Sequence, residues 1–416
     1  MKQSNISSIV KNKLCTSCGV CEACCPKKCI RFIDNDLTVT PMVDEETCVR
    51  CGICTQVCPG QGVDLDKMSN QQFHNDNCLY NKYVGYYRDA FVGYSMNYYD
   101  RFNSSSGGVL TSFLVYLLEK KIIDGALVVG FEKENPFEPC SYIATSSDQI
   151  LSSRGSKYIV TSLNKALCEL LNFKGKVVIV GLPCQIQGIR KWASKNSIVN
   201  NKIIGCFAIY CSLNKTRNSI DYYLQHHNIN KNTVDSFSFR GDGCMGYMKF
   251  VGDNRLIKKV PYMDYWHGTH SFFTNERCSV CIDHFGELAD VCFGDINIPP
   301  YNEDKVGINS IIVRSCYWQD LLTKAKEDGV IYISNAPIED ICKSQIYSKI
   351  FKKGDGVKMN FLIRSFRGLP NPKYDYIYDG KVSIKTMFKE TANMVMRMIG
   401  RNRKLWFIIH LLDKSK

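Results

Sequence analysis

One cysteine spacing occurs twice near the start of the chain, and it constrains the fold more than any other feature. The first copy runs from Cys15 to Pro26 and the second from Cys48 to Pro59, and both read C-x2-C-x2-C-x3-C-P. The proline that ends each copy turns the chain away, because it continues neither a helix interior nor a strand ladder. A segment this short cannot build a large core, so it must be held together by what its thiols bind.

This spacing is the one that holds two [4Fe–4S] clusters in bacterial ferredoxin-type segments, where the fourth cysteine of each run ligates the other cluster. It therefore predicts two thiol sets that exchange their last members. The first set is Cys15, Cys18, Cys21 and Cys58, and the second set is Cys48, Cys51, Cys54 and Cys25. Zinc sites group their ligands in pairs, so zinc knuckles or a disulfide framework fit the spacing less well. Cys24 and Cys29 lie outside the spacing and are predicted to be packing thiols.

Length and cysteine use set further bounds on the protein. With 416 residues, of which 45% are hydrophobic, the chain is long enough for two or three domains with sizeable cores. The stretch from Met1 to Lys13 lacks the apolar centre of a signal peptide, and iron–sulfur thiols need a reducing compartment, so we expect a cytoplasmic protein. No apolar run reaches about eighteen residues, so no membrane-spanning helix is expected.

The net charge of +13 is concentrated at the C-terminus. Residues 351–416 contain fifteen Lys and Arg against five Asp and Glu, whereas residues 1–66 contain seven against eight. No nucleic-acid-binding motif accompanies the basic excess, so we expect no nucleic-acid partner.

The middle of the chain alternates apolar strands with amphipathic helices, which predicts a mixed α/β layer with a largely parallel sheet. Strands are expected at 126–131, 176–181 and 203–210, and helices at 163–171, at 187–192 and from about 216. Cys184 and Cys211 fall at the carboxyl ends of two of these strands, where such sheets bind their ligands.

A further helix is expected at 109–118, directly after a serine- and glycine-rich turn. A serine at its start would cap it, and the two glycines would let a phosphate approach the free N–H groups. The alternative is an ordinary capped helix after a flexible turn, and the residues alone do not decide between the two.

Two short motifs follow. The pair Cys278-x2-Cys281 would join Cys184 and Cys211 as four thiols for a third [4Fe–4S] cluster. The alternative is that Cys184 and Cys211 are small core residues at strand ends. The run from Gly241 to Gly246 spells G-x-G-x-x-G, but a strand-like segment rather than a helix follows it. We therefore interpret it as a hairpin turn and predict no nicotinamide site there.

Seven short pieces in this order resemble the coenzyme F-420 hydrogenase/dehydrogenase beta-subunit family, from about Tyr83 to Ile341. The pieces are Ser105-Ser106-Gly107-Gly108, Arg154-Gly155-Ser156-Lys157-Tyr158, Pro183-Cys184-Gln185-Ile186, Cys211, Ser238-Phe239-Arg240, Cys278-x2-Cys281 and Ala289-Asp290-x3-Gly294-Asp295. Family members are iron–sulfur flavoproteins that bind FAD and pass electrons between clusters and a two-electron acceptor. The resemblance therefore implies FAD as a cofactor and favours a third cluster ligated by Cys184, Cys211, Cys278 and Cys281.

The resemblance also implies a flavin site. Its members would be Ser105, Ser106, Gly107, Gly108, Gly155, Ser156, Lys157, Tyr158 and Asp295, although Asp295 could equally cap a helix. Lys157 is the candidate catalytic residue, because an ammonium near the flavin N1 side would stabilise the anionic reduced form. Leu182, Ser212-Leu213 and Ile296-Asn297 depart from the usual family pattern on the expected substrate side, which argues against a deazaflavin substrate.

The basic tail ends in an amphipathic stretch. Its apolar members at helical spacing are Met387, Met394, Met398, Leu405, Ile409 and Leu412, with Arg397, Arg401, Arg403 and Lys404 between them. Such a helix could make a peripheral contact with an anionic membrane at its inner face. We favour packing on the protein itself or on a partner subunit, since the apolar run from Leu405 to Leu412 is short for a membrane anchor.

The sequence thus predicts three parts: an α+β ferredoxin-like module (1–70), a mixed α/β flavin-binding domain (78–350) and a helical C-terminal tail (351–416). The leading hypothesis is a flavin-dependent oxidoreductase that receives electrons from ferredoxin or another low-potential donor and acts on an unidentified substrate. Similar fusions are associated with cell-surface polysaccharide synthesis. The first alternative is a non-catalytic electron-transfer subunit of a larger redox complex, and the second is a membrane-surface scaffold with structural clusters.

Overall fold

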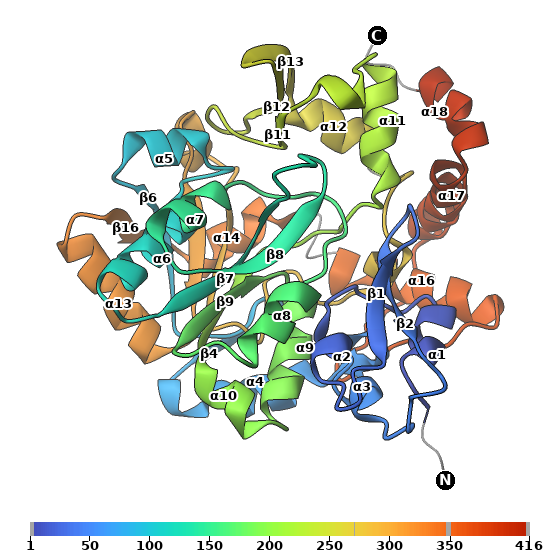
Figure 1. Cartoon of the computed structure of the whole chain (residues 1–416), viewed down its shortest axis with the longest axis horizontal. Helices are drawn as coiled ribbons and strands as arrows, with labels where there is room; N and C mark the ends of the chain where they lie inside the picture. Colours follow the sequence, from blue (N-terminus) through green and yellow to red (C-terminus); the bar gives the residue numbers. More distant parts are fainter. Residues whose placement is uncertain (1–3, 270, 347–350, 413–416) are drawn as a thin grey trace.

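An eight-stranded mixed sheet lies at the centre of the fold (Figure 1). The structure is a computed structural model and describes residues 4–269, 271–346 and 351–412. In spatial order the strands are β16 (Ile331–Asn335), β6 (Asp89–Ser95), β15 (Asn309–Val313), β14 (Val291–Asp295), β10 (Ile203–Ile209), β9 (Val177–Gly181), β7 (Gly125–Phe131) and β8 (Pro139–Ala144). The strands β14, β10, β9 and β7 are parallel, and the others pair antiparallel at the two sides. The predicted mixed α/β fold is confirmed.

The parallel strands form where the sequence has continuous apolar runs. All five residues of β9 are buried, as expected for a strand that helices cover on both faces. Cys184 follows β9 and Cys211 follows β10, so both thiols leave the sheet at the same edge.

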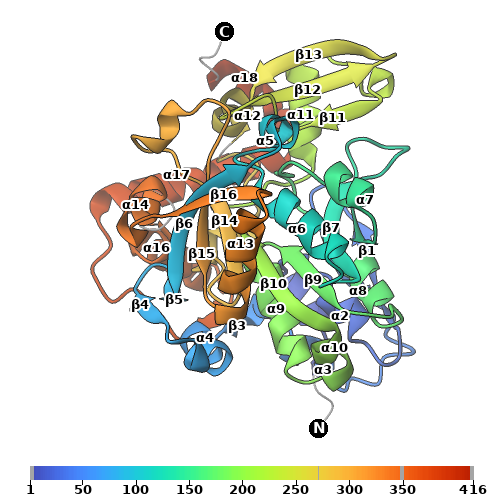
Figure 2. The same cartoon turned by 90° about the vertical axis from the view of Figure 1, so that its left-hand side faces the viewer.

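Helices cover both faces of this sheet (Figures 1 and 2). They are α6 (Val109–Glu119) and α13 (Cys316–Glu327) on one face, and α8 (Asn164–Leu170), α9 (Pro183–Ala193) and α10 (Ser197–Lys202) on the other. On the first face Phe113 and Trp318 pack against Phe207 of β10. On the second, Ile189 lies in one core with Ile179 of β9. The expected helix positions are confirmed, although α9 begins at Pro183 rather than near Gln187.

The N-terminal residues form a small unit beside α8 and α9 (Figure 1). Its elements are α1 (Ser7–Lys11), α2 (Val20–Ala23), the antiparallel pair β1 (Ile30–Asp34) and β2 (Val39–Val43), α3 (Ile53–Gln56), η1 (Pro59–Gln61), β3 (Gly62–Val63), α4 (Leu65–Phe73) and η2 (His74–Asp76). A methyl group on Gly188 of α9 would lie 3.4 Å from Cys18 Sγ, so this helix touches the first cysteine run directly. The polar segment after Pro59 resembles a linker in sequence, but it forms α4, whose N-cap Asp64 accepts from Lys67 N.

Smaller elements surround the sheet. They are β4 (Leu79–Asn81), β5 (Gly85–Tyr87), α5 (Tyr98–Asn103), α7 (Ser147–Ser152), α11 (Asn218–His226), η3 (Lys231–Thr233), β11 (Ser236–Ser238), β12 (Tyr247–Gly252), β13 (Arg255–Pro261), α12 (Tyr262–Thr269), η4 (Glu276–Val280) and η5 (Tyr301–Glu303). The glycine-rich run from Gly241 to Gly246 joins the antiparallel strands β11 and β12, so its interpretation as a hairpin turn is confirmed.

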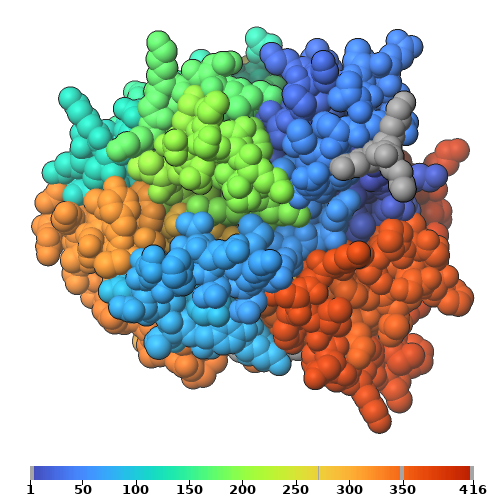
Figure 3. Space-filling model, turned by 90° about the horizontal axis from the view of Figure 1, so that it is seen from below, coloured from blue at the N-terminus to red at the C-terminus, as the bar shows by residue number. Residues whose placement is uncertain are grey.

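The C-terminal residues return to the N-terminal unit. They form α14 (Ile338–Ser344), α16 (Asp355–Phe366), β17 (Lys373–Tyr374), α17 (Ile384–Arg401), η6 (Arg403–Leu405) and α18 (Trp406–Leu412). Strand β17 pairs in parallel with β3, and Asp375 accepts from the backbone N–H groups of Leu65 and Asp66. Figure 3 shows the two ends of the chain, blue and orange-red, in contact on one face. Within the described ranges no helix is long and apolar enough to cross a membrane.

Candidate functional site

The second thiol set lines one cavity at the surface of the N-terminal unit. Cys25 from the first run lies there with Cys48, Cys51 and Cys54 from the second run, which is the exchange that the spacing predicts. Cys51 is exposed, so this set meets solvent. Cys29 also lines the cavity, and its Sγ lies 3.4 Å from Cys25 Sγ.

The first thiol set lies deeper in the N-terminal unit. Burial, and then the neighbouring Cys58 thiol, raises the pKa of Cys15 to about 12. The backbone N–H of Ser17 donates to Cys15 Sγ at 3.3 Å, and that of Gly60 donates to Cys58 Sγ at 3.3 Å. Backbone donors of this kind stabilise thiolates, which is the form that binds iron.

Cys24, which the spacing leaves out, lies between the first two sets. Burial raises its pKa, and the charges of Cys54, Cys25 and Cys18 add to the shift. Because Cys24 has neighbours in both the first and the second thiol set, these two sets lie close to each other.

The third thiol set lines a second cavity, at the edge of the sheet. Cys184 reaches it from the first turn of α9 and Cys211 from the segment after β10, whereas Cys278 lies in η4 and Cys281 directly follows η4. Burial raises the pKa of the Cys184 thiol, and the charges of Cys281, Cys211 and Cys278 raise it further, in that order. Cys18 of the first set also contributes, so the first and third sets are neighbours.

Two buried cations border the third set. The Lys352 ammonium donates to Cys281 Sγ at 3.4 Å and to Asp283 O at 2.8 Å. Burial opposes a charge on Lys352, but the thiols of Cys281 and Cys211 raise its pKa above the usual value. Arg277 lines the same cavity and donates to Tyr374 OH at 2.7 Å.

The surroundings of the third set fit an iron–sulfur cluster. Arg277 is buried, yet its Nε and Nη1 have no hydrogen-bond partner among the described residues. Cluster sulfides and thiolates accept hydrogen bonds from such donors. In the described part of the chain, no three His, Cys, Asp or Glu side chains are arranged to hold a single metal ion. A cubane is larger than one ion, and its thiols stand correspondingly further apart.

A larger cavity, which we call the sheet-edge cavity, opens beside the third set. Its volume is about 180 Å³, against about 30 Å³ for the cavity at the third set. Seven of the nine residues expected for a flavin site line it: Ser105, Ser106, Gly108, Gly155, Ser156, Lys157 and Asp295. Residues from three distant parts of the sequence therefore meet here.

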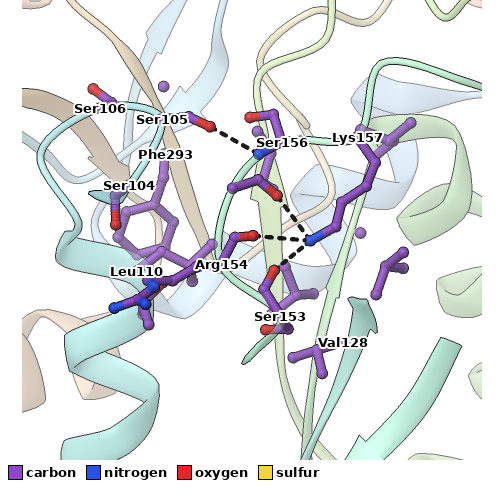
Figure 4. Close-up of a pocket in the computed structure, with 18 of the residues that line it drawn as sticks. Ser104, Ser105, Ser106, Leu110, Val128, Ser153, Arg154, Ser156, Lys157 and Phe293 are labelled. Atoms are coloured by element: carbon purple, nitrogen blue, oxygen red, sulfur yellow. Dashed lines mark hydrogen bonds between the residues drawn. The ribbon is translucent and has the colours of Figure 1, made fainter. Parts of the chain in front are cut away.

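Figure 4 shows how the turn at 153–157 is held in this cavity. The Lys157 ammonium donates to the carbonyl oxygens of Ser153, Arg154 and Gly155, at 2.5, 3.1 and 2.9 Å. The backbone N–H of Ser156 donates to Ser105 Oγ at 2.8 Å. Burial lowers the pKa of Lys157 to about 7. Lys157 thus shapes the turn, a role that sequence reasoning did not foresee.

Gly107 and Tyr158 do not line the cavity. A Cβ on Gly107 would lie 2.6 Å from Gly93 O, so Gly107 is required where the turn crosses the sheet. The Tyr158 ring stacks on Tyr262, and its hydroxyl accepts from Arg240 Nη1 at 3.1 Å. The same Arg240 nitrogen donates to Asp295 at 2.8 Å, so Tyr158 is connected to the cavity through that ion pair.

The serine N-cap expected for α6 is wrong. Gly108 occupies the N-cap position with φ of 76°, and the Val109 N–H donates to Asn309 Oδ1 of β15 at 3.0 Å. Asn309 also lines the cavity, but its contact is 200 residues away in sequence, and no local signal could have revealed it.

The third set and the sheet-edge cavity share a wall. Thr161, Leu182, Gln185 and Asn214 line both spaces. Gln185 is fixed there, because its Oε1 accepts from Leu182 N at 2.7 Å and its Nε2 donates to Thr161 O at 3.1 Å. The Asn214 N–H donates to Cys278 Sγ at 3.3 Å. One layer of side chains thus separates the third set from the larger cavity.

Family models match most of this architecture. The N-terminal model of the coenzyme F420 hydrogenase/dehydrogenase beta subunit matches residues 90–168, and the C-terminal model matches residues 174–339. The chain belongs to this family. A 4Fe-4S binding domain model matches residues 41–61, which contain the second cysteine run. The resemblance inferred from the seven short pieces is confirmed.

Three known proteins illustrate the relationship. The coenzyme F420 hydrogenase subunit beta of Methanosarcina barkeri is 26% identical over 281 residues, which is 65% of this chain and 90% of that protein. The coenzyme F420-dependent sulfite reductase of Methanocaldococcus jannaschii is 27% identical over 373 residues, 85% of this chain but 52% of that protein. A chain in a structure of the F420-reducing [NiFe] hydrogenase complex from Methanosarcina barkeri has the same fold, with a TM-score of 0.53, 23% identity, and coverage of 70% of this chain and 95% of its own.

Proposed function

We propose that this protein is an iron–sulfur flavoprotein that passes electrons between three [4Fe–4S] clusters and FAD, as the electron-transfer subunit of a larger redox complex. The clusters would be ligated by the first, second and third thiol sets. The observation that carries the proposal is the order of the sites. The second set meets solvent, the first set neighbours the third, and the third shares a wall with the sheet-edge cavity.

The sheet-edge cavity suits FAD through the groups that it offers. Backbone turns at 104–108 and 153–157 line it together with hydroxyls, and both suit a pyrophosphate. The Lys157 ammonium, held by the carbonyl oxygens of the second turn, adds a positive charge next to them. Leu110, Val128 and Phe293 supply apolar wall for a ring system. FAD, when bound, exchanges single electrons with clusters and electron pairs with an acceptor. Ser105 and Lys157 hold the 153–157 turn in place, and Asp295, paired with Arg240, presents a fixed carboxylate at the rim.

A subunit role fits better than independent catalysis. The relatives named above include a subunit of a hydrogenase, and the chain spans about half of the length of the sulfite reductase that it matches. We therefore favour the electron-transfer subunit over the enzyme that turns over its substrate on its own. Ferredoxin or another low-potential donor would deliver electrons at the second set, where Cys51 is exposed. A cytoplasmic location follows from the need for reduced thiols, and the association with polysaccharide synthesis stays a sequence-based hypothesis.

Iron, acid-labile sulfide and flavin content of anaerobically purified protein tests the proposal. We expect about twelve irons and one FAD per chain, since each cluster holds about four irons. A content of about eight irons per chain would contradict the third cluster. The absence of bound flavin after incubation with FAD would contradict the flavoprotein. Steady turnover of a substrate by the isolated chain with an artificial one-electron donor would restore the independent enzyme and contradict the subunit role.

A further inference from the structure

Helix α17 turns its apolar face away from the protein. Ile384, Phe388 and Met398 are exposed by 72%, 76% and 62%, and Met387 and Val395 are also exposed. These five residues lie on one side of the helix, because positions three, four, seven and eleven apart share a face. A surface helix normally buries such a stripe, but α17 packs on α16 through its other face and leaves the apolar stripe uncovered by the described residues. Packing of the stripe on a partner subunit stays a prediction.

The inward face of α17 is polar, and hydrogen bonds hold it. Glu390 and Arg397 are buried, and both bond to Asn360 of α16, at 2.9 and 3.3 Å. At the end of the helix, Arg401 donates to Glu276 of η4 at 2.7 Å. These bonds set the rotation of the helix about its axis, and that rotation leaves the apolar stripe outside.

Helix α18 continues the exposed apolar surface. Trp406 and Ile409 are buried in a core with Tyr222 and Phe273, which fixes the helix on α11. Phe407, Leu411 and Leu412 of the same helix are exposed. Figure 1 shows α17 and α18 as neighbours at one border of the molecule, outside the sheet and its covering helices.

The exposed charges on α17 itself are positive, whereas acidic side chains lie at its two ends, where Asp355 accepts from Ser383 and Asp221 accepts from Arg403. Glu390 is the single acidic residue of α17, and it faces inward, whereas Lys385 and Lys389 are exposed along one flank of the apolar stripe. Lys381 and Lys404 are exposed beside the two ends of the helix. An apolar stripe bordered by lysines is the pattern of helices that lie in the headgroup region of an anionic bilayer, where each lysine adds attraction.

From this arrangement we propose that α17 and α18 dock the protein peripherally on an anionic lipid membrane. Phe388 and Leu411 enter the boundary between headgroups and acyl chains, and Lys385 and Lys389 contact lipid phosphates. The polar inner face keeps its bonds to α16 and η4, so docking needs no refolding of the helix. The contact does not depend on the redox proposal.

Vesicle flotation of the full-length, cluster-loaded protein at physiological ionic strength tests this. Vesicles of phosphatidylcholine with phosphatidylglycerol should carry the protein, and vesicles of phosphatidylcholine alone should carry far less. Phe388→Ser with Leu411→Ser should lower binding by more than about tenfold, because two buried apolar side chains are lost. Lys385→Gln with Lys389→Gln should lower binding by about tenfold or more, on anionic vesicles alone. Phe388, Leu411, Lys385 and Lys389 are all exposed, so these variants should retain the wild-type iron content.

Ile198→Ser in α10 is the matched control, since it removes another exposed apolar side chain and should leave binding unchanged. Equal binding of the wild type and the Phe388→Ser, Leu411→Ser variant would overturn the proposal, as would failure to bind anionic vesicles. A concentration-dependent oligomer that the same variant dissolves would also overturn it, because a second copy of the chain would then cover the apolar surface.

Discussion

At the scale of single residues, Lys157 combines a structural bond pattern with a charge that changes near neutral pH. Its folded pKa of about 7 lies below the usual 10.5 because the side chain is buried. The ammonium is therefore present below pH 7 and is lost as the pH rises through 7. Since FAD is anionic, we expect its dissociation constant to rise by about tenfold between pH 6 and pH 8.

Fluorescence titration with FAD across this pH range measures the effect. In Lys157→Met the affinity should be low and independent of pH, and the flavin reduction potential should change little, because Lys157 bonds to the turn. A Lys157→Met protein with wild-type affinity at pH 6 would contradict this. A large fall in flavin potential would instead return Lys157 to the catalytic role that the family resemblance implied.

Lys352 is the second residue whose charge decides a property of the site. Its ammonium contacts Cys281 Sγ at 3.4 Å in a buried position. A cation there would stabilise the reduced, more negative form of the proposed third cluster, because the interaction is poorly screened. Lys352→Met should therefore lower the reduction potential of the third cluster, and Lys352→Arg should keep it near the wild-type value.

Redox titration followed by electron paramagnetic resonance measures that potential. Wild-type iron content in Lys352→Met with an unchanged potential would contradict the role of the charge. If the wild-type protein shows no signal from a third cluster, the cluster itself is absent. This result differs from an unchanged potential in Lys352→Met, which would contradict only the role of the charge.

At the scale of elements, the start of α6 depends on a bond from a distant strand. Asn309→Ala removes the acceptor of the buried Val109 N–H, and an unsatisfied buried donor costs about 1–3 kcal/mol. We expect the urea midpoint of unfolding to fall accordingly and FAD to bind more weakly, because the 104–108 turn precedes this helix. Asn196→Ala is the control, since it removes the cap of the short helix α10 at a half-buried site and should cost less. An equal loss in both variants would contradict the special role of Asn309.

This cap also shows what the sequence could and could not predict. The strand β9 and the helix α6 were predictable because their apolar patterns are local. The grouping of Cys25 with the second cysteine run was predictable from spacing, and the sheet edge brought Cys184 and Cys211 together by a general rule of parallel sheets. The roles of Asn309 and Lys352 were not predictable, since each residue reaches the site from a segment far along the chain. The outward face of α17 was missed because periodicity locates an apolar stripe but not the side that the protein covers.

At the scale of the whole molecule, the C-terminal residues fasten the N-terminal unit to the sheet domain. β17 pairs with β3, Arg364 donates to Asn12 O at 2.7 Å, and Lys352 reaches the third thiol set. The same segment thus contacts both parts that carry thiols. This arrangement fixes the separation between the first and third sets, on which the rate of electron transfer between them would depend.

The order of the thiol sets gives the last prediction. If electrons pass from the second set through the first to the third, Cys54→Ala should remove about four irons per chain. It should also slow reduction of the third cluster by reduced ferredoxin by at least about tenfold, because the remaining clusters lie further from the exposed edge. Dithionite, a small reductant, should still reduce the third cluster of this variant, which shows that the cluster itself is intact. Cys24→Ala is the matched control, since this thiol lies between the first two sets without belonging to either, and it should preserve both iron content and rate. Reduction of Cys54→Ala by ferredoxin at the wild-type rate would place the donor elsewhere on the molecule and would break the proposed sequence of electron transfer.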